Sequence, residues 1–188
     1  MATILNADTV VGGAIVTGDA SGQLALQSAG TTALTAASGN LTVANKMTVV
    51  GTSSTAGLKI ADVLETATIS ATAATGTINY DVTTQAVLYY TTNASANWTV
   101  NFRGSSGTSL NTLMATGESV TVAFFVTQGA TAYYNSAVQV DGASVTPKYQ
   151  GGTAWSAGNA SSIDAYTYTI IKAGNAAFTV FAAQTKFA

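Results

Sequence analysis

Short runs of alternating apolar and polar residues, broken by Gly, Asn, Asp and Ser, recur along most of the chain. This period-two alternation is typical of β-strands that bury one face. A short helix is expected over residues 109–115, with Ser109 as its N-cap and Gly117 as its C-terminal stop. Many short strands at this spacing predict an all-β fold with a two-sheet sandwich of jelly-roll type. Beyond residue 66 the strands are expected over residues 67–71, 77–82, 86–91, 98–102, 119–127, 137–140, 146–149, 166–172 and 178–183.

The N-terminal part has a nearly regular glycine pattern. Gly13, Gly22, Gly30 and Gly39 lie 9, 8 and 9 residues apart, and residues 18–22 have the chemistry of a hairpin turn. This spacing indicates small β-hairpins or a fibrous β-repeat in which several chains share a narrow core. A chance repeat in a low-complexity sequence is the alternative. The short runs between the glycines are residues 14–17, 23–27, 31–35 and 41–43.

A Gly/Ser/Thr cluster at residues 51–57 reads as a linker and divides the chain. We therefore predict an extended or fibrous β-segment over residues 1–60, used for assembly or anchoring, and a β-sandwich domain over residues 61–188.

Aromatic residues support the same division, because all eight Tyr, six Phe and two Trp lie from Tyr80 onwards. One aromatic side chain removes roughly 150–250 Å² from water when it is buried, so the first 79 residues cannot easily form a core of their own. They also lack the charge density of a solvated disordered tail. We expect residues 1–60 to become ordered by packing against a second domain, identical chains or a larger assembly.

Charge is scarce throughout the chain. Charged residues make up 7%, apolar residues 47%, and the formal net charge is −2. Typical soluble domains carry about 25% charged residues, so this chain has little charge to keep a monomer soluble. We expect much of its surface to be covered in an assembly, and a monomer with an uncharged Ser, Thr and Asn surface is the alternative.

The residue types that are missing exclude several function classes. Without Cys or His there can be no disulfide, no thiolate zinc site and no Ser-His-Asp triad. Six scattered Lys and Arg residues give no basic patch for nucleic acid. No apolar run approaches the length of a membrane span, and the N-terminus lacks the features of a signal peptide. We expect no metal or other cofactor. We also expect the chain to be synthesised in a cytoplasm.

Paired carboxylates are the one serious catalytic option, because glycoside cleavage needs two of them about 5–10 Å apart. Most have a structural explanation in the sequence. Asp141-Gly142 is a turn signal, Asp81 ends a predicted strand and Glu118 follows the predicted helix stop. The sequence therefore predicts a protein that is not an enzyme. The candidate carboxylates are Asp62, Glu65, Asp81, Glu118, Asp141 and Asp164.

A few side chains are candidates for contacts with a partner or receptor. Trp155 lies in a glycine-rich loop, where it either reads a carbohydrate or protein partner or folds back into the domain. Adjacent tyrosines on a strand point to opposite faces, so Tyr90 and Tyr134 are candidates to meet a sugar or a neighbouring subunit. Arg103 is the only arginine, and its expected partner is either Glu118, in an ion pair, or a carbonyl-rich turn.

Six runs are spread over residues 97–188: NWTVNFRG (97–104), LNTLM (110–114), VTQGATAYY (126–134), SVTPKYQGG (144–152), YTYTIIK (166–172) and QTKFA (184–188). Together they resemble a domain found in marine bacteriophage structural proteins. Two N-terminal segments, DASGQLALQ (19–27) and GTTALT (30–35), are similar to segments near the start of phage fibre and virion-surface proteins.

The resemblance implies a virion component that is made in the host cytoplasm. We expect a homotrimeric head decoration or cement protein that binds other virion proteins, above all the major capsid protein. A tail-fibre or adaptor protein that binds the host surface is an alternative. A carbohydrate-binding β-sandwich that recognises a host surface glycan is another.

Overall fold

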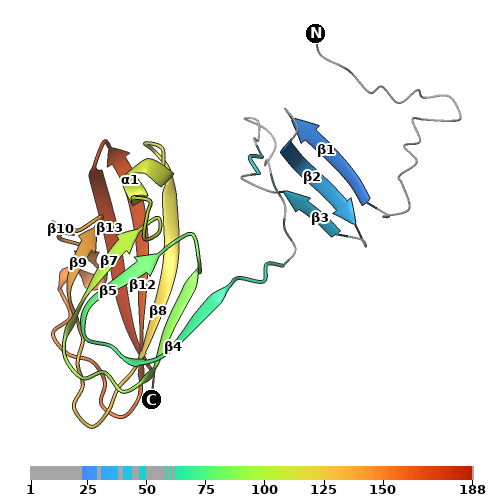
Figure 1. Cartoon of the computed structure of the whole chain (residues 1–188). Helices are drawn as coiled ribbons and strands as arrows, with labels where there is room; N and C mark the ends of the chain where they lie inside the picture. Colours follow the sequence, from blue (N-terminus) through green and yellow to red (C-terminus); the bar gives the residue numbers. More distant parts are fainter. Residues whose placement is uncertain are drawn as a thin grey trace, which may run out of the picture. The chain divides into compact units, whose positions relative to one another are not determined.

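The computed structural model describes residues 23–28, 31–37, 40–43, 47–49, 58, 60 and 62–187 of the chain (Figure 1). The chain divides into two compact units, Met1–Ala61 and Asp62–Ala188. This division falls one residue from the boundary that the sequence predicts.

The N-terminal unit contains a three-stranded antiparallel sheet with the strand order β1-β2-β3. Three of the predicted runs lie on these strands. The predicted run at 14–17 and the turn at 18–22 lie outside the described residues. What is described of this unit is therefore a simple meander of short strands, namely β1 (Gln23–Ser28), β2 (Thr31–Ala37) and β3 (Asn40–Val43).

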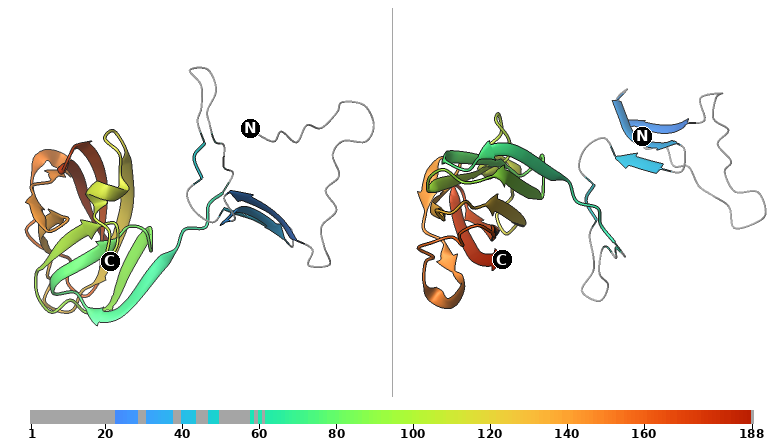
Figure 2. Two further views of the ribbon diagram at one scale, coloured as in Figure 1. Left: turned by 45° about the horizontal axis from the view of Figure 1, so that its top comes forward. Right: turned by 90° about the horizontal axis from the view of Figure 1, so that it is seen from below.

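The C-terminal unit is a two-sheet β-sandwich, which confirms the predicted all-β fold (Figures 1 and 2). The six-stranded sheet has the order β11-β13-β12-β8-β6-β4, and the four-stranded sheet has the order β10-β9-β7-β5. The strands of the six-stranded sheet are β4 (Ala67–Ala73), β6 (Val87–Thr92), β8 (Ser119–Thr127), β11 (Lys148–Tyr149), β12 (Ile163–Gly174) and β13 (Ala177–Phe187). Those of the four-stranded sheet are β5 (Gly76–Asp81), β7 (Trp98–Arg103), β9 (Asn135–Val140) and β10 (Ala143–Val145).

The chain alternates between the two sheets from β4 to β9. As a result β4, β6 and β8 pair in parallel in one sheet, and β5, β7 and β9 pair in parallel in the other. A jelly roll is built from antiparallel Greek keys, so the predicted jelly-roll comparison does not extend to the strand order. Periodicity reports which face of a strand is buried and carries no information on which strand lies next to it.

Apolar side chains at alternate positions of the central strands fill the space between the sheets. On β7, Trp98, Val100 and Phe102 are fully buried and point to the opposite sheet. The rings of Trp98 and Phe124 are 6.0 Å apart, and those of Phe102 and Tyr168 are 4.9 Å apart, in edge-on geometry. These contacts join β7 of one sheet to β8 and β12 of the other, so aromatic packing holds the two layers together.

Local turn chemistry accounts for the ends of several elements. The Oγ of Ser109 accepts a hydrogen bond from the N–H of Thr112 at 3.0 Å and caps helix α1 (Leu110–Leu113), which is shorter than predicted. Asp141 and Gly142 have φ angles of 51° and 80° and form the tight turn between β9 and β10. Strand β10 was not predicted because it has only three residues, and neither was the 3₁₀ turn at Gln150–Gly152.

Replacing the buried Phe102 with Ala should lower the free energy of unfolding of the sandwich by about 3–5 kcal/mol, because it removes ring contacts from both layers. Phe181→Ala is the matched control, since that side chain is 47% exposed, and its cost should stay below about 1 kcal/mol. Tryptophan fluorescence during urea unfolding measures both, because the two Trp residues lie in this unit. Equal losses for the two variants would contradict the assigned core.

Candidate functional site

The outer face of the four-stranded sheet is polar and bonded to itself. The Nδ2 of Asn101 on β7 donates to the Oδ1 of Asn79 on β5 at 2.8 Å, and its Oδ1 accepts from the N–H of Gly142 at 2.8 Å. This face therefore satisfies its own polar groups and tolerates water.

Arg103 takes part in the same polar face with a partner other than the predicted one. Its Nε lies 2.5 Å from the Oδ1 of Asp81, and its terminal Nη2 donates to Oδ2 at 3.3 Å. The two residues are direct neighbours in the β5–β7 register. The prediction of Glu118 as the partner of Arg103 was wrong, because parallel pairing of β5 with β7 cannot be read from the sequence. The carboxylate of Glu118 accepts the N–H of Ala115 at 2.8 Å.

The outer face of the six-stranded sheet is different in kind, because it carries an apolar depression of about 410 Å³ across neighbouring strands. Ile69, Tyr89 and Phe125 lie next to one another in the register of β4, β6 and β8. Ile69 is 61% exposed and Phe187 is 51% exposed. We call this surface the apolar face, and its lining residues are Ala67, Ile69, Val87, Tyr89, Phe125, Ile163 and Phe187.

Exposed apolar side chains also precede the sandwich along the chain. Val63 and Leu64 lie just before β4 and are exposed, as are Leu58 and Ile60 further upstream. Single exposed apolar residues are ordinary, whereas contiguous apolar patches are typical of surfaces that bind another molecule.

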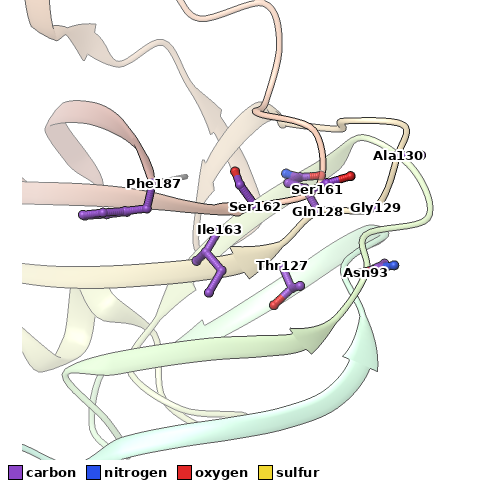
Figure 3. A pocket seen from close by; sticks show the side chains of 9 residues that line it. All are labelled: Asn93, Thr127, Gln128, Gly129, Ala130, Ser161, Ser162, Ile163 and Phe187. Carbon is purple, nitrogen blue, oxygen red and sulfur yellow. The ribbon is translucent and has the colours of Figure 1, made fainter.

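A second depression, of about 500 Å³, lies at the end of the six-stranded sheet next to the apolar face (Figure 3). It shares Ile163 and Phe187 with that face, and the other residues that line it offer hydroxyl, carboxamide and backbone groups. We call it the polar pocket, and it is lined by Asn93, Thr127, Gln128, Gly129, Ala130, Ser161, Ser162, Ile163 and Phe187.

The side chains of Gln128 and Asp164 connect the loops around the polar pocket through hydrogen bonds. The Nε2 of Gln128 donates to the carbonyl of Tyr133 at 2.7 Å and to the Oδ2 of Asp164 at 3.0 Å. The same oxygen of Asp164 accepts the N–H of Asn159 at 3.0 Å. Gly158 lies so close to these groups that an added Cβ would be 2.4 Å from the Asp164 Oδ2. The pocket walls are therefore held by a buried polar network.

Burial raises the pKa of Asp164 above its ordinary value of 3.8, although the Asn159 N–H, Gln128 and Lys186 favour the charged form. The carboxylate is fully buried, and its Oδ1 has no hydrogen-bond partner in the structure. The folded protein therefore holds this proton more tightly than the unfolded chain does.

Trp155 folds back against the sandwich, which is one of the two outcomes that the sequence left open. Its Nε1 donates to the carbonyl of Asn135 at 2.6 Å. Its ring lies edge-on to Tyr149 at 4.8 Å and to Tyr166 at 5.2 Å. The indole is therefore held in place by packing and by a backbone hydrogen bond, and the half-buried side chain also lines a depression of about 200 Å³ together with Thr153 and Gln184.

The two tyrosine candidates also occupy half-buried positions. Tyr90 packs on Phe124 at 5.5 Å against the core, and burial raises the pKa of its hydroxyl. Its neighbour Tyr89 is the member of that pair that lines the apolar face. Tyr134 lies in the loop before β9, where its N–H donates to the Oδ1 of Asn97 at 3.1 Å. The structure therefore does not bring Trp155, Tyr90 and Tyr134 together into one site.

Most of the candidate carboxylates have structural partners. Asp141 accepts the N–H groups of Leu110 at 2.7 Å and Asn111 at 2.9 Å at the start of α1. The buried Lys172 donates to the carbonyls of Asn111 at 2.6 Å and Met114 at 2.8 Å at the other end of that helix. Within the described part of the chain, no group of three or more Asp, Glu, His or Cys side chains is placed to hold a metal ion. No helix among the described residues is long and apolar enough to cross a membrane.

Sequence reasoning missed the apolar face. Val87 and Tyr89 alternate with buried residues on β6, which looks like an ordinary half-buried strand until the strand order is known. The signal that could have found it is the unbroken apolar run at residues 122–126 of β8 (Ser119–Thr127), which leaves Phe125 on the face opposite the buried residues. Comparisons with known protein families, with characterised proteins and with solved structures find no match to this chain.

Replacing Trp155 with Ala should lower the free energy of unfolding by about 2–4 kcal/mol, because it removes three edge-on ring contacts and a half-buried hydrogen bond. Trp155→Phe should retain much of the packing and lose less. Far-UV circular dichroism during urea unfolding measures both, since it does not depend on the indole. A fully stable Trp155→Ala protein would return the side chain to the candidate contacts.

The stability of the sandwich should fall as pH rises from 3.8 through the raised pKa of Asp164, because over that range the folded state binds more protons than the unfolded state. Asp164→Asn removes this titration, so the wild type should lose stability relative to the variant as pH increases. Urea unfolding at a series of pH values gives the difference. The exposed Thr77→Asn, which changes no titrating group, is the control and should run parallel to the wild type. Parallel curves for Asp164→Asn as well would contradict the assignment.

Proposed function

We propose that the protein is a non-enzymatic structural component of a bacteriophage particle, exposed on the head as a decoration or cement protein. The observation that carries the proposal is the contrast between the outer faces of the sandwich. One is a polar, self-bonded surface around Asn79 and Asn101, and the other is the apolar face around Ile69 and Phe125. A protein with this contrast is suited to meet water on one side and protein on the other.

The division of the chain supports an anchored, projecting arrangement. The N-terminal unit has few charges and no aromatic residue, since the first aromatic residue of the chain is Tyr80. This composition favours a segment that becomes stable through contacts in an assembly. In the proposed role this unit contacts the major capsid protein, and the sandwich projects from the particle as part of a homotrimer. The resemblance of residues 97–188 to phage structural proteins supports the same role.

The polar pocket supports a second candidate, a tail-fibre or adaptor protein that binds a host surface glycan. Hydroxyl and carboxamide groups beside an apolar ring, here Ser161, Asn93 and Phe187, are the chemistry that recognises an uncharged sugar. The pocket replaces the Trp155 loop as the place for such binding. Head decoration remains the preferred role, because the apolar face and the exposed residues before β4 are suited to protein contacts.

Antibodies raised against the recombinant full-length protein, applied to intact particles of the encoding phage and viewed by electron microscopy, test the proposal. We expect label distributed over the head. Label confined to the tail would favour the fibre or adaptor role, and glycan binding that is lost in Asn93→Ala would then locate the receptor site in the polar pocket. Particles that carry no label and no copy of the protein by mass spectrometry would overturn the virion role.

A further inference from the structure

We infer that the apolar face and the adjoining edge of β4 bind a second copy of this chain, sandwich to sandwich. The inference deepens the proposed assembly role, on which it rests, by naming the partner and the surface. It assigns the contact between copies to the C-terminal sandwich, in addition to any contact made by residues 1–60.

The edge of β4 is open to another strand. Among the described strands β4 pairs only with β6, and its other edge has no partner. Proteins protect such edges with charged residues, Pro or very short strands. The opposite edge of this sheet is protected in this way, since β11 has two residues, carries Lys148 and follows Pro147. In contrast, β4 has seven residues with neither a charge nor a Pro.

The chemistry of the apolar face selects its partner. All seven lining residues are apolar or aromatic, so the face offers no charge that would attract an acidic, basic or nucleic-acid partner. Ile69 and Phe187 are more than half exposed on it. Only another uncharged apolar protein surface complements this one, and an identical copy supplies that surface at the same concentration as the chain itself.

A stable contact needs more residues than those that line the apolar face, so the residues before β4 are included in the inferred surface. A stable interface buries about 800 Å² on each partner, with about 20 residues a side, and the lining residues alone are too few. Val63 and Leu64 are exposed and are separated from β4 by the exposed Glu65 and Thr66, and the side chains of β4 are mostly exposed as well. In the inferred contact these exposed residues add to the area that the apolar face contributes.

The mass of the full-length protein in solution, measured by light scattering after size exclusion and by sedimentation over a concentration series, tests the inference. We expect an oligomer, with the mass of three 18.8 kDa chains in the proposed trimer. Ile69→Lys and Phe187→Lys should raise the dissociation constant by about tenfold or more each, because association would bury an unpaired ammonium. Circular dichroism should show that both variants are folded, since both side chains are exposed.

Thr77→Lys is the matched control, because Thr77 is an exposed β-branched residue on β5, the edge strand of the other sheet. It should leave the oligomer intact. A dissociation constant of the Ile69→Lys/Phe187→Lys double variant equal to that of the wild type would overturn the inference by assigning self-association to other residues. A wild type that stays monomeric and binds only capsid particles would overturn it by identifying a different partner.

The two proposals fail separately. Label on the phage head together with a monomeric protein would leave the head-decoration role standing and would remove the homotrimer and the inference. A mass that falls in Ile69→Lys and Phe187→Lys, together with unlabelled particles, would support the copy contact and remove the virion role.

Discussion

Edge-on contacts between aromatic rings across the two sheets are the interaction on which the sandwich depends. Trp98 meets Phe124 at 6.0 Å and Tyr166 at 5.6 Å, so one residue of β7 is held against two strands of the opposite sheet. Tyr166 in turn meets Trp155, which connects the glycine-rich loop to the same cluster. Both Trp residues of this chain therefore serve packing between the layers, and this is why the loop presents no free indole.

Three other aromatic residues lie outside this cluster, on the surface of the sandwich. Tyr89, Phe125 and Phe187 have no place between the sheets, and they lie together on the outer face of the six-stranded sheet. A monomeric protein would gain solubility from polar residues at these positions. The outer face of the four-stranded sheet, with Asn79 and Asn101 bonded to each other, shows that this chain can build such a polar surface. The contrast within one domain therefore supports a partner for the apolar side.

Elements fixed by local chemistry could be predicted from the sequence. Strand β8 spans the predicted residues 119–127, and Ser109 caps α1 through a contact three residues away. The turn at Asp141 and Gly142 likewise depends on these two adjacent residues alone, because both adopt positive φ. In each case the residues that decide the structure lie within a few positions of one another.

The contacts that could not be predicted are those set by strand order. Arg103 pairs with Asp81, 22 residues away, because β5 and β7 run parallel in register. The same limit applies to the tyrosine pair on β6. Periodicity separates Tyr89 from Tyr90, but only the position of β6 between β4 and β8 shows which of them faces outward. The candidate site needed the same information, since the residues that line it come from five strands.

Self-association through the sandwich would change what the N-terminal unit has to do. A segment without aromatic residues gains little free energy from each contact, so one copy alone would hold a particle weakly. When copies are joined, the second and third N-terminal units bind at a high effective concentration, and the assembly can hold far more tightly than one chain. The apolar face would then supply what the N-terminal sequence lacks. Low charge, a core-poor N-terminal unit and an apolar outer sheet would be three parts of one design, in which stability is reached by the assembly and not by the single chain.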